Sequence, residues 1–281
     1  MISTLSEQHI FRIFLNLSTT RVILDDGIHD KGVKITMMED ECNQWERLAG
    51  EYVEADKFYE AGNRFKQAAA CYLDRVLDMT RKSAENYHIA AEASVESDDH
   101  KGAALAYFEA ATQYRQVSDF ATALTLYENA AKEALLERMT ETAAQSYLWA
   151  AFACHKLGNR EYFLTAAKNM ANLYQKASEK AIDDGKAERA LIDLSLAAMG
   201  YATIDKFDKA NELLEKADMI IGKTSWDWLK TLLAFSKALT QDRLEDAVDI
   251  HTDFNEEATI QQVMGACLSI RQEIEKTKRK N

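Results

Sequence analysis

Apolar residues along most of the chain recur with the spacing of helices that bury one face. Trp45, Leu48, Ala49 and Tyr52 stand at positions i, i+3, i+4 and i+7, which fall on one side of a helix with 3.6 residues per turn. Segment 61–68 continues with a small residue, a large one four positions later and a small one three positions further on. The pattern predicts two amphipathic helices that pack closely through small side chains.

This small-large-small signature recurs along the chain, and polar breaks such as 97–99, 118–119, 158–159 and 183–185 separate helices of about 20 residues. The copies are Ala61/Phe65/Ala68, Ala104/Phe108/Ala111, Ala123/Tyr127/Ala130, Ala143/Tyr147/Ala150 and Ala210/Leu214/Ala217. Two helices make a unit of about 40 residues, which is longer than the ~34 of a tetratricopeptide (TPR) repeat with the same signature. The predicted helices are 42–56, 61–79, 82–97, 101–116, 119–136, 140–157, 160–178, 186–203, 206–221, 225–240, 242–254 and 257–278, and 6–23 could form one more.

Composition favours the same fold. The 281 residues include no Pro, which the turns of β and mixed folds commonly recruit, and Ala, the best helix former, is abundant after residue 48. We expect an all-α protein, a TPR-like α-α superhelix (a right-handed solenoid of antiparallel helical hairpins) with a C-terminal helical bundle. Its expected parts are an N-terminal helical or irregular segment at 1–40, the solenoid at 41–223, and the bundle with a basic tail at 224–281.

Charge and cysteine content narrow the class of protein. There are 34 Lys and Arg against 46 Asp and Glu, a formal net charge of −12, so we expect no nucleic-acid partner. No stretch approaches the ~18 apolar residues of a membrane span, and no signal peptide is evident, which favours a cytoplasmic location. The cysteines lie far apart in the sequence, and we expect free buried thiols in a reducing compartment. They are Cys42, Cys71, Cys154 and Cys267.

Chemically active constellations are scarce. His88 with Glu92, and His155, fall short of the three or four ligands of a metal site, so these residues are expected to be structural. The acidic pairs at 98–99 and 183–184 are interpreted as helix caps. We therefore expect no metal, no cofactor and no enzymatic activity.

Two tryptophans, Trp226 and Trp228, straddle a predicted helix start. Residues at i and i+2 cannot share a helix face, so we expect one ring to be buried. The other ring would be partly exposed and could anchor a partner.

Hairpins of this length in a chain near 300 residues resemble the soluble NSF attachment proteins (SNAPs). Segments 103–111 and 119–131 resemble two successive helices of that family, nearest its γ type, and 229–233 with 244–248 resemble the C-terminal bundle of its α type. The resemblance extends over roughly 42–275. It implies an adaptor in the cytoplasm that lies along a SNARE four-helix bundle and recruits the hexameric ATPase NSF, which pulls that bundle apart.

The chain departs from the family at three places. Its end, 275–281, is basic where the family has an acidic tail finishing in Leu, which puts ATPase stimulation in doubt. The membrane-dipping Phe-Phe loop of the α members is absent, and only Phe11 and Phe14 share a helical face that could make a peripheral membrane contact. Lys209 matches a charged contact residue of the family that precedes a helix's first small residue, whereas Thr122 stands at the corresponding place in an earlier helix.

Two functional hypotheses follow. An adaptor of SNAP type would present cations to the mostly acidic surface of a SNARE-like coiled-coil bundle and would also bind an NSF-type ATPase. Cations at helix ends recur near turns and could line one edge, and they are Lys101, Arg115, Arg138, Arg160 and Lys209. The alternative is a TPR scaffold that binds a short peptide or chaperone tail. Its carboxylate-binding residues on the first helices would be Asn43, Lys82 and Asn86.

Overall fold

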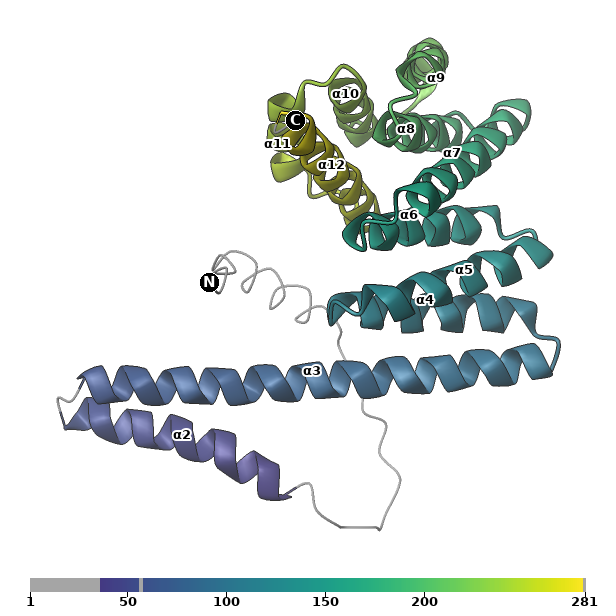
Figure 1. Cartoon of the computed structure of the whole chain (residues 1–281). Helices are drawn as coiled ribbons and strands as arrows, with labels where there is room; N and C mark the ends of the chain where they lie inside the picture. The colour runs from purple at the N-terminus through teal and green to yellow at the C-terminus, as the bar shows by residue number, and fades with distance from the viewer. Residues whose placement is uncertain (1–35, 56–57, 280–281) are drawn as a thin grey trace. The chain divides into compact units, whose positions relative to one another are not determined.

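The computed structural model describes residues 36–55 and 58–279, and they are almost entirely helical (Figure 1). About 87% of the described residues are in helices and none of them is in a strand, which confirms the all-α prediction. The helices are α2 (Thr36–Glu54), α3 (Phe58–Glu96), α4 (His100–Gln116), α5 (Phe120–Leu136), α6 (Thr140–Lys156), α7 (Arg160–Asp183), α8 (Ala187–Thr203), α9 (Phe207–Ile220), the short 3-10 helix η1 (Ile221–Lys223), α10 (Trp228–Thr240), α11 (Leu244–Asp253) and α12 (Ala258–Lys278). The possible helix at 6–23 lies outside the described residues.

Seven three-residue turns join these helices, and they share one backbone design. The central residue of each has a positive φ between 56 and 71°. The residue after it donates its N–H to a carbonyl five positions earlier, as Asn159 does to Cys154 over 2.9 Å. This is the hydrogen bond of a Schellman cap. The central residues are Asp98, Ser118, Arg138, Gly158, Gly185, Asp205 and Asp242.

Polar residues at these turns also begin the next helices. The side chains of Asp99, Asp119 and Asn159 accept a hydrogen bond from the backbone N–H three residues later, over 2.9, 3.1 and 3.3 Å. These N-caps satisfy N–H groups that have no partner inside the helix. The interpretation of Asp99 as a cap of the next helix is confirmed. It is wrong for the pair 183–184, because Asp183 and Asp184 lie at the end of α7 and Lys186 precedes α8.

One predicted boundary is wrong. The segments expected as separate helices at 61–79 and 82–97 form the single 39-residue helix α3. No Gly or helix-capping pattern interrupts it near residue 80. Instead, Thr80 Oγ1 donates to the Val76 carbonyl over 2.8 Å, and Lys82 forms a 2.7 Å ion pair with Asp78 one turn earlier. Both interactions are satisfied by a continuous helix.

The chain divides into two compact units, residues 1–72 and 73–281. In the second unit, helices α4 to α9 pack consecutively as antiparallel hairpins, in agreement with the predicted solenoid (Figure 1). Helix α10 then packs on α8, and α12 returns to α6 and α8, which gives the C-terminal helical bundle. A continuous core runs through this unit, and its fully buried large side chains include Tyr127, Tyr174, Leu191, Phe235 and Phe254.

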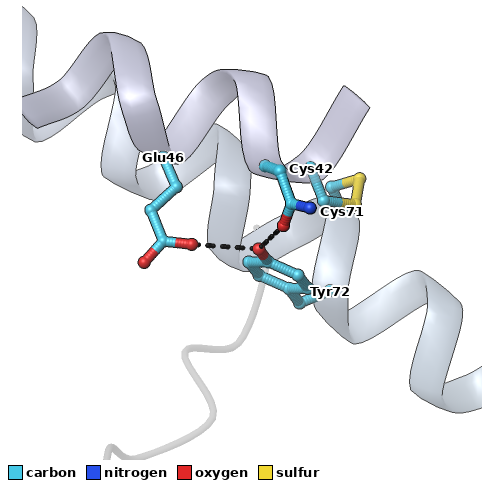
Figure 2. Close-up of a disulfide and its surroundings, with 5 residues drawn as sticks. Cys42, Glu46, Cys71 and Tyr72 are labelled. Atoms are coloured by element: carbon cyan, nitrogen blue, oxygen red, sulfur yellow. Dashed lines mark hydrogen bonds between the residues drawn. A yellow bond between two sulfur atoms is a disulfide. The ribbon is translucent and has the colours of Figure 1, made fainter. Parts of the chain in front are cut away.

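In the first unit, the described part is a hairpin of α2 and the beginning of α3. A disulfide between Cys42 and Cys71 joins these helices (Figure 2), so the prediction of free thiols is wrong for this pair. The antiparallel hairpin places the two residues opposite each other, which their separation of 29 residues does not reveal. Cys154 and Cys267 are free and buried, as predicted.

Candidate partner-binding surface

The described residues do not gather a metal site. No three of their His, Cys, Asp or Glu side chains are placed to hold a metal ion. His88 lies 3.6 Å from the carboxylate of Glu92 on its own helix, and His155 Nε2 lies 2.7 Å from the carboxylate of Glu273 on α12. Each histidine therefore contacts one carboxylate within the fold. Among the described helices, none has the length and apolar character needed to cross a bilayer.

The turns of the α4–α9 array fall alternately on two edges. His100 at the start of α4 lies 2.7 Å from the carboxylate of Glu133 near the end of α5, which shows that these helices are antiparallel. Arg189 near the start of α8 donates over 3.0 Å to Glu141 near the start of α6, so these two helices begin on the same side. The first edge contains turns 97–99, 137–139 and 184–186. The second edge contains turns 117–119, 157–159 and 204–206.

The five predicted binding residues are divided between these edges. Lys101 and Arg138 lie on the first edge, whereas Arg115, Arg160 and Lys209 lie on the second. The expectation that all five line one edge is wrong, because consecutive turns of antiparallel hairpins lie at opposite ends of the helices.

Arg115 is occupied by contacts within the fold. Its Nε donates to the Tyr127 hydroxyl over 3.2 Å, and its guanidinium lies 3.9 Å from the centre of the Trp149 ring. The side chain thus links α4 to α5 and α6, and this cation–π contact is a stabilising one. Burial raises the pKa of the Tyr127 hydroxyl, and the nearby Arg115 charge opposes that shift. Arg115 therefore has less freedom to meet a partner than the other four cations.

The remaining four cations are exposed. Lys209 Nζ lies 5.4 Å from the centre of the Tyr201 ring, which leaves its charge open to solvent. Lys101, Arg138 and Arg160 have no ion pair among the described residues. Arg138 is the central residue of its turn, with a φ of 56°. Arg160 and Lys209 both stand in the first turn of a helix on the second edge.

A buried cation that the sequence analysis did not single out, Arg271, binds carboxylates in two turns of the second unit. The Arg271 side chain on α12 is 1% exposed and binds the carboxylates of Asp205 at 2.5 Å, Asp242 at 2.8 Å and Glu275 at 3.2 Å. Burial disfavours the charge of Asp205, but the bonds to Arg271 and Lys278 outweigh it and lower the pKa of that carboxyl. Arg271 thereby ties α12 to the turns before α9 and α11.

This arrangement changes the interpretation of the basic tail. Lys278 binds Asp205 and Glu275 at 3.3 and 2.8 Å, and Glu273 pairs with His155 and Lys156 of α6. Of the cations at this end, Arg271 and Lys278 are therefore paired with carboxylates of the second unit. Lys276, Lys278 and Arg279 are all exposed, and among the described residues Lys276 and Arg279 have no ion pair.

The three residues considered for peptide binding are engaged elsewhere. Asn43 accepts from the Tyr72 hydroxyl over 2.8 Å. Lys82 pairs with Asp78, and the Asn86 side chain donates to the backbone carbonyl of Lys82 over 2.8 Å. Lys82 and Asn86 also belong to the one long helix α3 rather than to the first helix of a separate repeat. They do not form the predicted carboxylate clamp.

The tryptophan pair is partly as predicted. Trp226 is 50% exposed and Trp228 is half-buried against Phe254, with ring centres 6.1 Å apart. The two indoles nevertheless stack on each other at 5.8 Å. The argument from helix faces does not apply, because α10 begins at Trp228 and Trp226 precedes it.

Comparison with known proteins identifies a relative that matches part of the chain. No family model matches the chain. Over 102 residues the chain is 29% identical to the vesicular-fusion protein SEC17 of Coprinopsis cinerea, and the match covers 36% of this chain and 35% of that protein. The chain thus matches about a third of the length of this relative. The similarity supports a SNAP-like relationship over that part of the chain.

Proposed function

We propose that the protein is a SNAP-like adaptor, which binds SNARE-type helical bundles and recruits an NSF-type AAA+ ATPase for their disassembly in vesicle trafficking. The observation that carries this proposal is the partial similarity to a vesicular-fusion protein. The antiparallel hairpin array with its C-terminal bundle is compatible with the role. In this role the chain is not an enzyme and needs no cofactor, because ATP hydrolysis belongs to the partner.

We assign the SNARE-binding surface to the second edge. Arg160 and Lys209 are exposed in the first turns of α7 and α9, and Lys209 is also the position that matches the family's charged contact. An acidic helical bundle would then lie across the second edge of successive hairpins.

The energetics require several contacts. An exposed ion pair contributes only ~0.2–1 kcal/mol, so no single cation would determine the affinity. The chain also has a net charge of −12, which opposes association with an acidic partner away from the contact. Binding should therefore weaken steeply with salt, because exposed pairs are screened beyond ~8–10 Å at 0.1–0.15 M.

Co-sedimentation with an assembled four-helix SNARE bundle tests this proposal. The wild type would be measured at about 50 and about 300 mM salt, and we expect binding at the lower concentration only. The NSF-type ATPase would be added separately, and we expect it to sediment with the SNARE bundle only when this chain is present. Failure to bind the bundle at low salt would refute the proposed function.

Two matched variants test the edge. Arg160→Glu with Lys209→Glu reverses two charges on the second edge, and Lys101→Glu with Arg138→Glu makes the same change on the first. We expect the second-edge variant to lose about tenfold or more in affinity and the first-edge variant to stay within about twofold. Circular dichroism would check that both remain helical. Equal losses, or a loss confined to the first-edge variant, would refute the assignment.

The proposed location is the cytoplasm, with a possible peripheral contact to membranes. Phe11 and Phe14, the residues that suggested this contact, lie outside the described residues. Sedimentation of the chain with SNARE-free vesicles of neutral and acidic lipid would measure the membrane contact independently of the SNARE bundle.

A further inference from the structure

The disulfide of the first unit joins two helices through one sheltered and one accessible residue. Cys42 on α2 is 1% exposed, whereas Cys71 on α3 is half-buried. Their Cα atoms are 5.6 Å apart, close to the commonest distance for disulfides. A thiolate from solvent can therefore approach the Cys71 side of the bond more readily than the Cys42 side.

Apart from this bond, the hairpin buries little apolar surface. The described apolar residues that are buried between residues 42 and 72 are small, and they are Cys42, Ala49, Ala61 and Ala68. The larger Val53 and Phe65 are 41% and 47% exposed, and Trp45, Leu48 and Tyr52 are only half-buried. Since hydrophobic stabilisation grows with the apolar area removed from water, such a core holds two helices together weakly.

The polar contacts of the hairpin are near the surface and surround the disulfide (Figure 2). The Tyr72 hydroxyl, next to Cys71 in sequence, lies 2.8 Å from Asn43 Oδ1 and 3.0 Å from the carboxylate of Glu46. Further along, the Arg64 guanidinium lies 4.9 Å from the centre of the Trp45 ring. Exposed contacts of these kinds are individually weak.

The other two cysteines, in contrast, are free thiols that are fully buried. Cys154 and Cys267 are fully buried in the second unit, and burial raises the pKa of their thiols to about 11 and about 12. They are thiols without a disulfide partner, and at neutral pH they hold their protons and react slowly. The chain therefore contains an internal reference of two cysteines that should not respond to redox conditions.

We propose that Cys42–Cys71 is a redox clasp, which docks α2 on α3 when oxidised and releases it when reduced by a dithiol. In the first step, a thiolate of the dithiol attacks Cys71 Sγ, the disulfide breaks, and the Cys42 thiolate leaves and takes up a proton. The second thiol of the reductant then attacks the mixed disulfide and releases the Cys71 thiol. Two electrons pass to the protein, and the reductant becomes a disulfide.

The clasp controls access to the alanine face of the hairpin. With the bond closed, Ala49, Ala61 and Ala68 are buried. With the bond open, the small core leaves α2 free to separate from α3 and exposes that face. This inference is independent of the proposed function, because none of the cations assigned to partner binding belongs to the hairpin.

Hydrogen exchange of the full chain, followed by mass spectrometry, tests the clasp. The oxidised protein would be compared with the same protein after dithiothreitol treatment. We expect amides of 42–54 to exchange on the order of 100-fold faster after reduction, and amides of 120–136 in the second unit to keep their rates. The variant Cys42→Ser with Cys71→Ser should exchange rapidly in 42–54 without reductant and should not respond to dithiothreitol.

Thiol counting completes the test. After mild oxidation with glutathione disulfide, alkylation in denaturant should label two cysteines, and after full reduction it should label four. Four labels in the oxidised sample would overturn the proposal, because the bond would not form. Unchanged exchange of 42–54 on reduction would also overturn it, because the bond would then not control docking.

Discussion

The two units of the chain differ in the interactions that stabilise each of them internally. The described hairpin of the first unit combines an alanine core with a disulfide. The second unit has a continuous core of aromatic and aliphatic side chains, and the buried Arg271 ties its last helix to two earlier turns. Similar amphipathic patterns thus produce helical hairpins that differ in how much apolar surface they bury. The hairpin that buries only small apolar side chains among its described residues is also the one that carries a covalent link.

Removal of the buried cation should give the largest effect on the second unit. Arg271→Met leaves the carboxylates of Asp205, Asp242 and Glu275 without their shared partner. Because Asp205 and Asp242 are partly solvated, we expect a loss of ~2–3 kcal/mol in the free energy of unfolding. Urea denaturation at pH 7 would measure it. Lys276→Met, at an exposed position of the same helix, is the control and should change stability by less than ~0.5 kcal/mol. Equal effects of the two variants would mean that the stability of the second unit does not depend on the ion pairs of Arg271.

Overpacking should reveal how closely the helices of the second unit approach. Ala104 and Ala123 are fully buried. We expect Ala104→Leu or Ala123→Leu to cost ~1–3 kcal/mol, because the added side chain has no space to occupy. Thr125→Leu, which adds the same side chain at an exposed position, is the control. Chemical denaturation midpoints that do not change in either alanine variant would show that the core is loosely packed.

A buried acid should make the second unit less stable as pH rises. Asp193 Oδ2 accepts from Arg189 over 2.8 Å, but its Oδ1 has no hydrogen-bond partner among the described residues. Burial raises the pKa of Asp193 from 3.8 to about 6. The folded state therefore binds this proton more tightly than the unfolded state, and stability falls as pH rises between these two values.

The corresponding variant is Asp193→Asn. It removes the charge but keeps the shape, and we expect a gain of ~1–2 kcal/mol at pH 7 that disappears near pH 4. Thermal denaturation at both pH values would measure it. A variant less stable than wild type at pH 7 would show that the Arg189 bond outweighs the cost of burial.

The smallest expected effect concerns the turns. Arg138 has a φ of 56°, a conformation that costs a side-chain-bearing residue ~1–2 kcal/mol, whereas Gly158 occupies the equivalent place in the next turn. We expect Arg138→Gly to stabilise the protein by ~0.5 kcal/mol after the entropy cost of Gly, and Gly158→Arg to destabilise it by about as much or more. Denaturation of this reciprocal pair would measure both. Destabilisation by Arg138→Gly would indicate that the arginine makes compensating contacts.

The sequence was sufficient for most helices because their apolar spacing and polar turns are local signals. The single helix α3 was predicted as two helices, 61–79 and 82–97, because polar breaks separate the other helices about every 20 residues. No comparable break stands near residue 80, and the local sequence there is compatible with a continuous helix. The Cys42–Cys71 bond was missed because pairing depends on hairpin register. The sequence shows that cations recur near turns. Their assignment to one edge or the other depends on the direction of each helix, which only the structure gives.

The importance of Arg271 did have a signal in the sequence. Met264, Cys267, Leu268 and Arg271 stand at i, i+3, i+4 and i+7, so the arginine occupies a core position of an apolar face. The buried Asp193 lies in the same way between Ala190 and Ala197. A charged residue in such a register is a candidate for a buried ion pair, because an unpaired charge would be too costly there. Its partners, in contrast, come from distant turns and required the fold.

Site-specific photo-crosslinking tests the central claim most directly. A photoreactive amino acid would replace Arg160 on the second edge or, as the matched control, Arg138 on the first, and each full-length variant would be irradiated with an assembled four-helix SNARE bundle at low salt. The account predicts crosslinks from position 160 to SNARE chains and few or none from position 138. Crosslinks mainly from position 138, or none from either position, would contradict it.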